Sequence, residues 1–342
     1  MLKRIFGICI ATVLGLVAFT QVNYFDKGFD AFQREKYDNA VYFYSLYLED
    51  NPSANTYFNR GLSFYKLGEL DKAISDFTTV IVKEVEDFEA WYNRGLANLD
   101  AGNIDSAISD YQQSILLHPN NDKAYAGLAL SYYEKKEYEM ALDFFNMAVS
   151  LNDHRAGTYY NRGLTHSALN DKQSALEDIT TAISLDNEKV DFYISRADIY
   201  HRNGDFAMSI KDYTTALNLS PESKTLYYNR GISKYDLKNF EEAIGDFEEV
   251  LRYDSLHVHS LWYLALSHKE LGNELESKKY YESVERLDPD YEHLWSIDKN
   301  QLVLKKFIKD NWIYAIALIV LLLASLFFVR KLVKSNKKTP ID

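Results

Sequence analysis

The chain has 342 residues, a formal net charge of −12 at pH 7 and a single cysteine, Cys9. The acidic balance disfavours a nucleic-acid partner, which would require a basic surface. One cysteine cannot build a disulfide framework, and because it lies in an N-terminal apolar segment, we expect no thiol nucleophile in the rest of the chain.

The first twenty residues have the pattern of a secretory signal. The basic pair Lys3–Arg4 precedes the apolar run Ile5–Phe19, and Ala18 and Thr20 would occupy the small positions before a cut at Gln21. A short basic segment, an apolar run and a small-residue end are the features of a signal peptide that is removed after export. We therefore expect residues 1–20 to direct the following chain across a membrane. An uncleaved signal anchor is the alternative.

Residues 21–291 repeat with a period of 34. The stretch 88–121 contains two amphipathic helical patterns, separated by Ala101–Gly102–Asn103 and closed by Pro119. The pattern recurs in eight consecutive units, of which the first is one residue short. The units are 21–53, 54–87, 88–121, 122–155, 156–189, 190–223, 224–257 and 258–291. We number positions from the first residue of each unit.

The columns of this alignment hold residues that suit two packed helices. Position 8 is always Gly or Ala, position 20 is Ala or Ser, and position 24 is aromatic or Ile. Small residues at the first two positions allow a close helix crossing. The turn, at position 15, carries Gly68, Gly102, Gly204 and Gly272. Position 32, where the second helix ends, carries Pro52, Pro119, Pro221 and Pro289.

This layout resembles the tetratricopeptide repeat, which has Trp, Gly, Ala, an aromatic residue and Pro at set offsets. In the unit 88–121 these residues are Trp91, Gly95, Ala107, Tyr111 and Pro119. The resemblance implies an all-α fold, a right-handed superhelical solenoid of antiparallel helix pairs. It also implies a non-enzymatic protein that holds a peptide or protein partner, because in this family the first helices line a concave groove.

The resemblance places positions 5 and 6 on that groove. An asparagine at position 6 could bind a ligand backbone, since its amide offers a donor and an acceptor. An aromatic residue at position 5 would add contact area. The residues implied are Asn59, Asn93, Asn161 and Asn229, together with Tyr92, Tyr160, Tyr228 and Trp262. The alternative for the asparagines is hydrogen bonding between repeats.

Arginine at position 7 and aspartate at position 23 occur together or not at all. Five units carry both: Arg60 with Asp76, Arg94 with Asp110, Arg162 with Asp178, Arg196 with Asp212, and Arg230 with Asp246. The other three carry Lys27 with Phe43, Leu128 with Phe144, and Leu264 with Tyr280. Position 7 faces the second helix in this family, so we expect a structural ion pair inside each of the five units.

We expect no catalytic residue, no metal site and no cofactor. His257, His259 and His268 are accompanied by no cysteine and no repeated acidic spacing, so packed or solvated side chains are expected rather than ligands. No phosphate-binding glycine loop, nucleophile elbow or paired-carboxylate motif occurs. Residues 21–309 instead hold 31 basic and 48 acidic residues, which favours a solvated acidic surface.

The chain after the repeats divides into three segments. Residues 292–311 mix apolar and charged residues and are predicted to form a capping helix or linker, because the last repeat would otherwise leave an apolar face in water. Residues 312–329 carry no charge and are just long enough to cross a bilayer. The tail 330–342 is basic, and with the N-terminal signal it predicts a cytoplasmic C-terminus.

These features together predict a single-pass membrane protein with an extracytoplasmic repeat array, in the periplasm of a bacterium. Its expected function is a scaffold for protein–protein interaction in an envelope assembly. One alternative is a non-enzymatic sensor or receptor subunit that signals through a partner. Another is a cytosolic, tail-anchored adaptor, which leaves the run Ile5–Phe19 unexplained.

Overall fold

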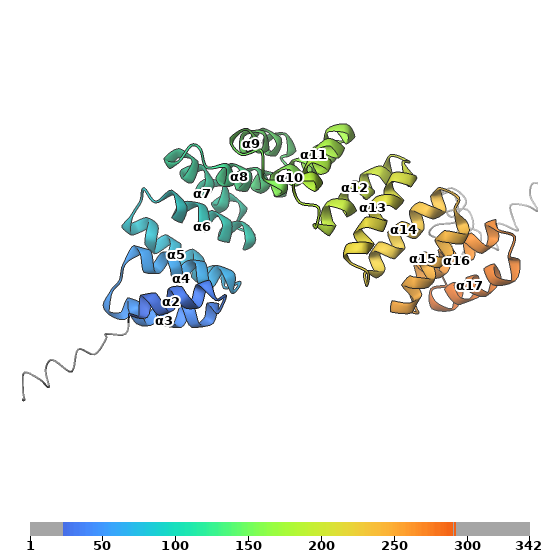
Figure 1. The fold of residues 1–342 in the computed structure, drawn as a ribbon, viewed down its shortest axis with the longest axis horizontal. Helices are drawn as coiled ribbons and strands as arrows, with labels where there is room; N and C mark the ends of the chain where they lie inside the picture. Colours follow the sequence, from blue (N-terminus) through green and yellow to red (C-terminus); the bar gives the residue numbers. More distant parts are fainter. Residues whose placement is uncertain (1–22, 290, 292–342) are drawn as a thin grey trace, which may run out of the picture. The chain divides into compact units, whose positions relative to one another are not determined.

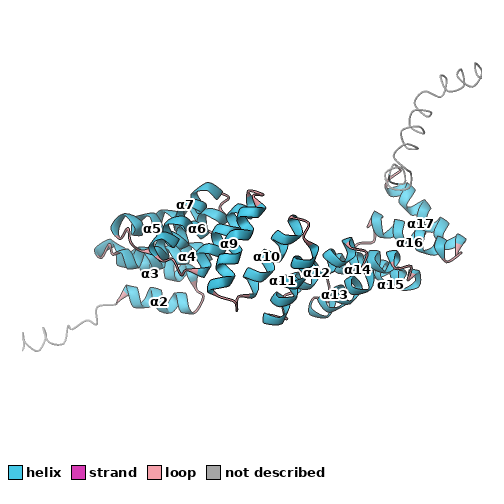
Figure 2. Cartoon of the chain, turned by 90° about the horizontal axis from the view of Figure 1, so that it is seen from above, coloured by secondary structure: helices cyan, strands magenta, loops and turns pink. Residues whose placement is uncertain are grey.

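The computed structural model describes residues 23–289 and 291, and this part of the chain is built from helices (Figure 2). Over these residues it contains sixteen α-helices and no strand, so the predicted all-α array of helix pairs is confirmed. The helices are α2 (Tyr24–Gln33), α3 (Tyr37–Asp50), α4 (Ala54–Lys66), α5 (Leu70–Lys83), α6 (Phe88–Asp100), α7 (Ile104–Leu117), α8 (Asp122–Glu134), α9 (Tyr138–Leu151), α10 (Ala156–Ala168), α11 (Lys172–Leu185), α12 (Val190–Arg202), α13 (Phe206–Leu219), α14 (Lys224–Asp236), α15 (Phe240–Tyr253), α16 (Val258–Glu270) and α17 (Glu274–Leu287).

The chain forms two compact units, Met1–Gly204 and Asp205–Asp342. The described part of the first unit contains α2 to α12, and that of the second contains α13 to α17 (Figure 1). The division falls at the turn between α12 and α13, inside the sixth repeat.

The helix bounds follow the 34-residue period closely. Every second helix begins at position 17 and ends at position 30, and every first helix ends at position 13. Between them, position 15 always has a positive φ, because the chain must reverse direction within three residues. In the second repeat, for example, the amide of Glu69 donates to the carbonyl of Phe64 across Gly68, whose φ is +75°.

Four repeats place glycine at this turn and four do not. The glycines are those predicted, Gly68, Gly102, Gly204 and Gly272. The residues with a side chain in the left-handed conformation are Glu35, Lys136, Asn170 and Lys238, with φ between 58° and 65°. Since a Cβ is strained in this conformation, the turn is specified by the helices on either side and not by glycine alone.

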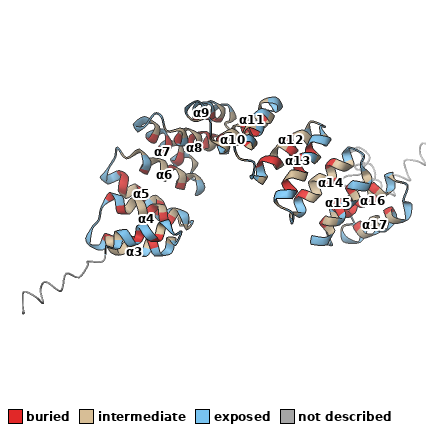
Figure 3. Cartoon of the chain, in the orientation of Figure 1, coloured by how far each residue is buried: buried red, intermediate tan, exposed pale blue. Residues whose placement is uncertain are grey.

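Each helix pair packs through the small and large residues of the repeat pattern, and the buried residues lie on the facing sides of the helices (Figure 3). A Cβ added to Gly61 would lie 2.9 Å from the ring of Phe77, at position 24 of the same repeat. Phe77 and the alanine at position 20, Ala73, are both fully buried. The small residue at position 8 therefore makes room for the large one at position 24.

The first helices of neighbouring repeats also contact each other directly, as α4 does with α6, α6 with α8, and α8 with α10. Within the first unit, α6, α8 and α10 lie on the inner side of the curve that their repeats follow, with α7, α9 and α11 outside (Figure 1). We call the surface formed by the first helices of a unit its inner face. In the second unit the same contact joins α14 and α16.

Among residues 23–289 and 291, no helix combines the length and apolar character needed to cross a bilayer. Four of the predicted segments lie outside the described residues. They are the signal 1–20, the capping segment 292–311, the membrane span 312–329 and the basic tail 330–342.

The turn geometry predicts opposite effects for two substitutions at position 15. Gly102→Ala should lower the free energy of unfolding by about 1 kcal/mol, because a Cβ is strained at its φ of +79°. Lys136→Gly should raise it by about 0.5 kcal/mol, because relief of that strain exceeds the entropic cost of glycine. The midpoint of urea unfolding, followed by circular dichroism, measures both.

Gly245→Ala is the control, since Gly245 lies inside α15 and an added Cβ meets nothing within 4 Å. This variant should be stabilised by about 1 kcal/mol through helix propensity. Stabilisation of Gly102→Ala to the same extent would contradict the role assigned to position 15.

Candidate functional site

Four of the five arginine–aspartate pairs predicted from the sequence are present in the structure. In each, the guanidinium donates two hydrogen bonds to the carboxylate in its own repeat; for Arg94 these are Nε to Asp110 Oδ2 at 3.0 Å and Nη2 to Oδ1 at 2.6 Å. The closest separations are 2.7 Å for Arg60–Asp76, 2.6 Å for Arg94–Asp110, 2.7 Å for Arg162–Asp178 and 2.6 Å for Arg230–Asp246. Arg196 belongs to the first unit and Asp212 to the second, and their pairing stays a prediction.

The same arginines also reach into the preceding repeat, a contact that the sequence pattern did not reveal. Nη1 of Arg94 donates to Thr78 Oγ1 at 3.1 Å, and position 25 supplies the acceptor in every case. The five acceptors are Ser45, Thr78, Asn146, Thr180 and Thr214, for Arg60, Arg94, Arg162, Arg196 and Arg230 respectively. The arginine therefore joins three helices of two repeats.

A signal for this contact exists in the alignment. Position 25 is Ser, Thr or Asn in every repeat that precedes an arginine. Before the two leucines, Leu128 and Leu264, it is Gln112 and Glu248. Position 25 thus carries a short hydroxyl or amide side chain where the next repeat has an arginine at position 7. It carries a longer side chain where the next repeat has a leucine there.

An aromatic residue at position 4 supports the guanidinium from the other side. The Arg94 Cζ atom lies 4.8 Å from the ring centroid of Trp91, a distance suited to a cation–π contact. The equivalent contacts are Arg60 over Tyr57, Arg162 over Tyr159, Arg196 over Tyr193 and Arg230 over Tyr227, at 5.3 to 6.0 Å. These contacts fix the orientation of position 7 and hence that of the neighbouring position 6.

The position-6 asparagines lie half-buried on the first helices. The side-chain amides of Asn59 and Asn93 donate to the carbonyls of Asn55 and Glu89, one turn earlier in the same helix, at 2.8 Å each. In the described part of the chain no residue bonds to the side chains of Asn161 and Asn229, and none of the four amides bonds to another repeat. Hydrogen-bonding capacity is therefore left open along the inner face.

The tyrosines at position 5 in the first unit, Tyr92 and Tyr160, pack against other aromatic rings as well as lining the inner face. The ring of Tyr92 lies 5.9 Å from that of the buried Tyr111, and burial raises the pKa of Tyr92. Tyr160 packs 4.6 Å from Phe192 of the next repeat, and its hydroxyl lies 2.9 Å from Ser195 Oγ. The ring of Tyr92 thus packs on the second helix of its own repeat, and that of Tyr160 packs on the first helix of the next repeat.

In the second unit Trp262 at position 5 is packed more deeply, and the groove role expected for it is wrong. Its side chain is only 5 % exposed, with ring centroids 5.3 Å from Tyr281 and 5.6 Å from Tyr291. Trp262 therefore does not offer the broad contact surface expected from position 5. Tyr228 is half-buried against Phe247 at 6.1 Å, and burial raises its pKa.

One cleft contains a predicted groove asparagine, Asn59. It has a volume of about 250 Å³ at the junction of the second and third repeats. It is lined by Ala54, Asn55, Phe58, Asn59, Glu84, Asp87 and Glu89. Asp87 is engaged in capping α6, through the amides of Glu89 and Ala90. The free carboxylates of Glu84 and Glu89 give this part of the inner face a negative charge.

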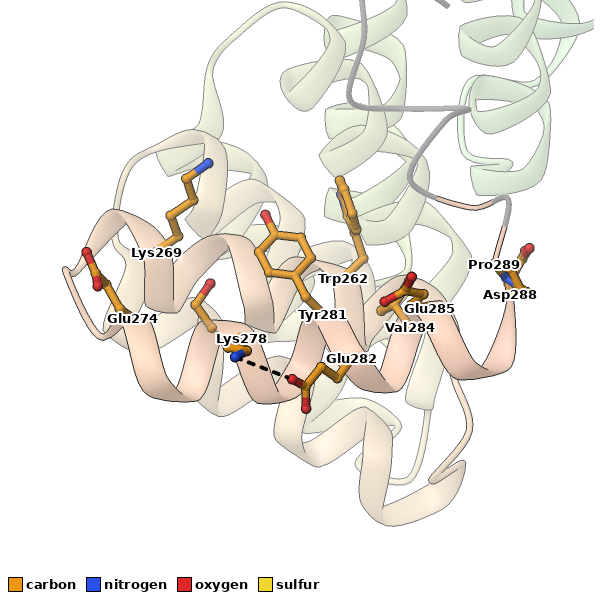
Figure 4. Close-up of a pocket in the computed structure, with 11 residues that line it drawn as sticks. Trp262, Lys269, Glu274, Lys278, Tyr281, Glu282, Val284, Glu285, Asp288 and Pro289 are labelled. Carbon is orange, nitrogen blue, oxygen red and sulfur yellow. Dashed lines mark ion pairs between the residues drawn. The ribbon is translucent and has the colours of Figure 1, made fainter. Parts of the chain in front are cut away.

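A larger cleft of about 680 Å³ lies on the last repeat (Figure 4). Its apolar lining includes Trp262, Tyr281 and Val284, and charged residues of α16 and α17 form its rim. Tyr291 packs on Trp262, so the chain continues from beside this cleft toward the predicted capping segment 292–311.

The histidines considered as metal ligands are placed among aromatic rings. His268 stacks on Tyr280 with ring centroids 5.6 Å apart, and His257 and His259 lie beside Tyr228. Over residues 23–289 and 291, no group of three or more His, Cys, Asp or Glu side chains is placed to hold a metal ion.

Comparison with known proteins agrees with this architecture. Two family models, both described as tetratricopeptide repeat, match residues 58–116, 99–156 and 228–292, and residues 156–189 and 190–223. Together they span more than half of the sequence, and the chain belongs to the tetratricopeptide repeat family. The pair α2–α3 precedes these matches but has the same helix bounds within its repeat. No protein of curated function matches the sequence.

Several solved structures are similar to this chain. A tetratricopeptide repeat protein from Parabacteroides merdae superposes with a TM-score of 0.54 at 18 % identity, over 71 % of this chain and 97 % of that one. PilF from Pseudomonas aeruginosa gives 0.49 at 17 % identity, over 59 % and 92 %. YrrB, a TPR protein with an unusual peptide-binding site, gives 0.48 at 19 % identity, over 54 % and 95 %. The class that fold and family define is a scaffold for protein–protein interaction.

The buried ion pair predicts a large penalty for removing one partner. Arg94→Leu should lower the free energy of unfolding by about 3 kcal/mol or more, because Asp110, 3 % exposed, is left charged and without its main partner. Arg94→Leu combined with Asp110→Phe should recover most of this loss, because Leu128 and Phe144 occupy these positions in the next repeat. Chemical denaturation of the three proteins measures the difference.

If the double variant is destabilised by the sum of the two single effects, the pair is not a coupled unit and the interpretation fails.

Proposed function

We propose that this chain is a membrane-anchored, extracytoplasmic scaffold that holds an extended polypeptide segment of a partner protein on its inner face. The observation that carries this proposal is the open hydrogen-bonding capacity of the position-6 asparagines. Asn161 and Asn229 have no side-chain partner among the described residues, and the carbonyl oxygens of Asn59 and Asn93 are free to accept. An extended peptide backbone supplies the donors and acceptors that such amides require.

The scaffold is suited to this task because its amides stand on rigid elements. Position 6 is followed directly by the arginine that joins two repeats and by the small residue at position 8. The helix backbone that carries position 6 is thereby fixed, so little backbone conformational entropy is lost when a ligand binds. We propose a binding role for these amides and not a reaction.

The placement at a membrane rests on the sequence. The apolar segments 5–19 and 312–329 flank the repeat array, and each is followed or preceded by basic residues in the way that export signals and membrane anchors require. A protein so placed would present its inner face to partners on the far side of the membrane, in an assembly of the cell envelope.

The groove proposal predicts that the asparagines bind the partner additively. A photo-crosslinking residue at Asn93 identifies the bound segment, which is then synthesised as a peptide. Replacing Asn59, Asn93 and Asn161, which all belong to the first unit, together by Ala should weaken its binding by about 3 kcal/mol, since each lost hydrogen bond contributes about 1 kcal/mol. Isothermal titration calorimetry with the synthetic peptide measures this change.

Asn218→Ala is the matched control, because Asn218 is an exposed asparagine on the second helix α13. Its affinity should equal that of the unchanged chain. The groove proposal fails if the triple variant, folded by circular dichroism, binds the peptide as tightly as the control.

The topology proposal predicts different labelling of the array and the tail. Cys9 is the only cysteine and can be replaced by Ser, after which Val82→Cys or Lys337→Cys supplies a single thiol. Val82 is 80 % exposed, so its thiol should react in intact cells with a maleimide that cannot cross the inner membrane. The thiol at position 337 should react only after the membrane is permeabilised. Reaction of both thiols, or of the tail alone, before permeabilisation would rule out this topology.

A further inference from the structure

The last repeat begins with an unusual helix cap. His257 is the N-cap residue of α16, and its Nδ1 accepts a hydrogen bond from the backbone amide of Ser260 at 3.2 Å. Nδ1 also lies 2.9 Å from Ser260 Oγ. Where other first helices in the array have a side-chain cap, the acceptor is an oxygen of Asn, Ser or Asp. Only a neutral imidazole can accept through Nδ1, so the cap of α16 depends on the protonation state of His257.

A second imidazole, that of His259, lies between this cap and Tyr291, the last residue that the structure describes. His259 Nδ1 forms a hydrogen bond with the hydroxyl of Tyr291, and the two rings are 5.0 Å apart. The rings of His257 and His259 lie 5.9 Å from each other. Both also face Tyr228 of the preceding repeat, at 5.1 Å and 6.3 Å. The cap, the preceding repeat and Tyr291 therefore form one aromatic cluster.

The surroundings of His257 disfavour a charge on its ring. From α14 it meets Lys224 and Tyr228, from the end of α15 Asp254, and from α16 His259. Burial of the ring is the main cause that lowers the pKa of His257 below its ordinary value of 6.5, and His259 and Lys224 act in the same direction. Asp254 opposes them, but its carboxylate is bound to Lys224 Nζ at 3.1 Å. The positive end of the α16 dipole adds to the penalty for a charged imidazole.

The sign of the effect follows from linkage. Because the pKa is lower in the folded than in the unfolded chain, the unfolded state binds the proton more readily. The stability that the neutral cap contributes is fully present above pH 6.5 and is lost as the pH falls through the folded pKa. Burial, together with the neighbouring Tyr263 and Asp288, raises the pKa of the Tyr291 hydroxyl to about 12. Tyr291 therefore stays protonated throughout this pH range.

The last repeat has no arginine at position 7 to compensate for a weakened cap. Its positions 7 and 23 are Leu264 and Tyr280, so the guanidinium contact to the preceding repeat is missing. Among the described helices, the pair α16 and α17 packs against one other repeat, the seventh, through α14 and α15. In a linear array such a terminal repeat opens most easily, so a small change at its cap changes its population of open states.

We propose that His257 is a pH-sensitive cap, and that its protonation loosens α16, α17 and Tyr291 from the preceding repeat. The device lies at the junction between the array and the segment that follows Tyr291. Mild acidification would release this junction and leave the arginine-joined repeats of the array in place. The inference is independent of what binds to the inner face.

Hydrogen–deuterium exchange of the full chain in detergent micelles tests the proposal at pH 7.5 and pH 5.0. Peptides of α14 and α15 serve as the internal reference, since they share the second unit and correct for intrinsic exchange. The equilibrium constant for opening of α16 and α17, taken relative to this reference, should increase about fivefold at the lower pH. This is the change expected when the hydrogen bond of an N-cap residue is lost. His257→Asn is the matched variant, because asparagine caps a helix without titrating.

Opening of α16 and α17 in the His257→Asn protein should not depend on pH. The proposal is overturned if wild type shows no relative increase, or if His257→Asn shows the same increase. If this variant is unfolded at pH 7.5, nuclear magnetic resonance of the wild-type protein with labelled histidine tests whether His257 acts as the cap. The His257 ring must then titrate below pH 6.5 with the Ser260 amide shift following the same curve, and independent titration of that amide would refute the cap.

Discussion

The arginine at position 7 is the contact on which the rest of the array depends. Its two parallel hydrogen bonds to aspartate hold the helices of one repeat together, and its third nitrogen reaches the preceding repeat. Only a planar guanidinium can serve both partners at once, because a lysine ammonium offers neither the fork geometry nor the flat face that stacks on Trp91. Burial raises the cost of breaking the pair, so each arginine fixes the register of two repeats.

The triplet Asn-Arg-Gly shows how one turn of helix serves three purposes. Successive residues on a helix point about 100° apart. In the third repeat, Asn93 therefore lies on the inner face, Arg94 reaches Asp110, and Gly95 meets the ring of Tyr111. The binding group gains its rigidity from the two residues that follow it, and the binding face and the core cannot be altered independently.

Repeats without arginine at position 7 are held by other means, and these differ along the chain. The fourth repeat replaces the pair by Leu128 and Phe144, which add to its apolar core. The first sets Lys27 over the ring of Phe43 at 5.6 Å. The eighth relies on aromatic rings and histidines, among them Trp262 and His257. The end of the array is thereby held by groups whose interactions respond to conditions that leave a guanidinium unchanged.

The sequence by itself determined the bounds of the repeats, the position of the turn between paired helices, the small and large residues that pack each pair, and four arginine–aspartate pairs. These features repeat within 34 residues and depend on neighbours in the same repeat, so periodicity and co-occurrence reveal them. Only the tertiary structure decided which side chains face solvent. Trp262 and Tyr92 both occupy position 5, which was expected to be open, yet Trp262 is 5 % exposed and Tyr92 packs on Tyr111 of its own repeat. The link from Arg94 to Thr78 and the cap at His257 likewise depend on how one repeat is stacked on the next, a geometry that no single repeat encodes.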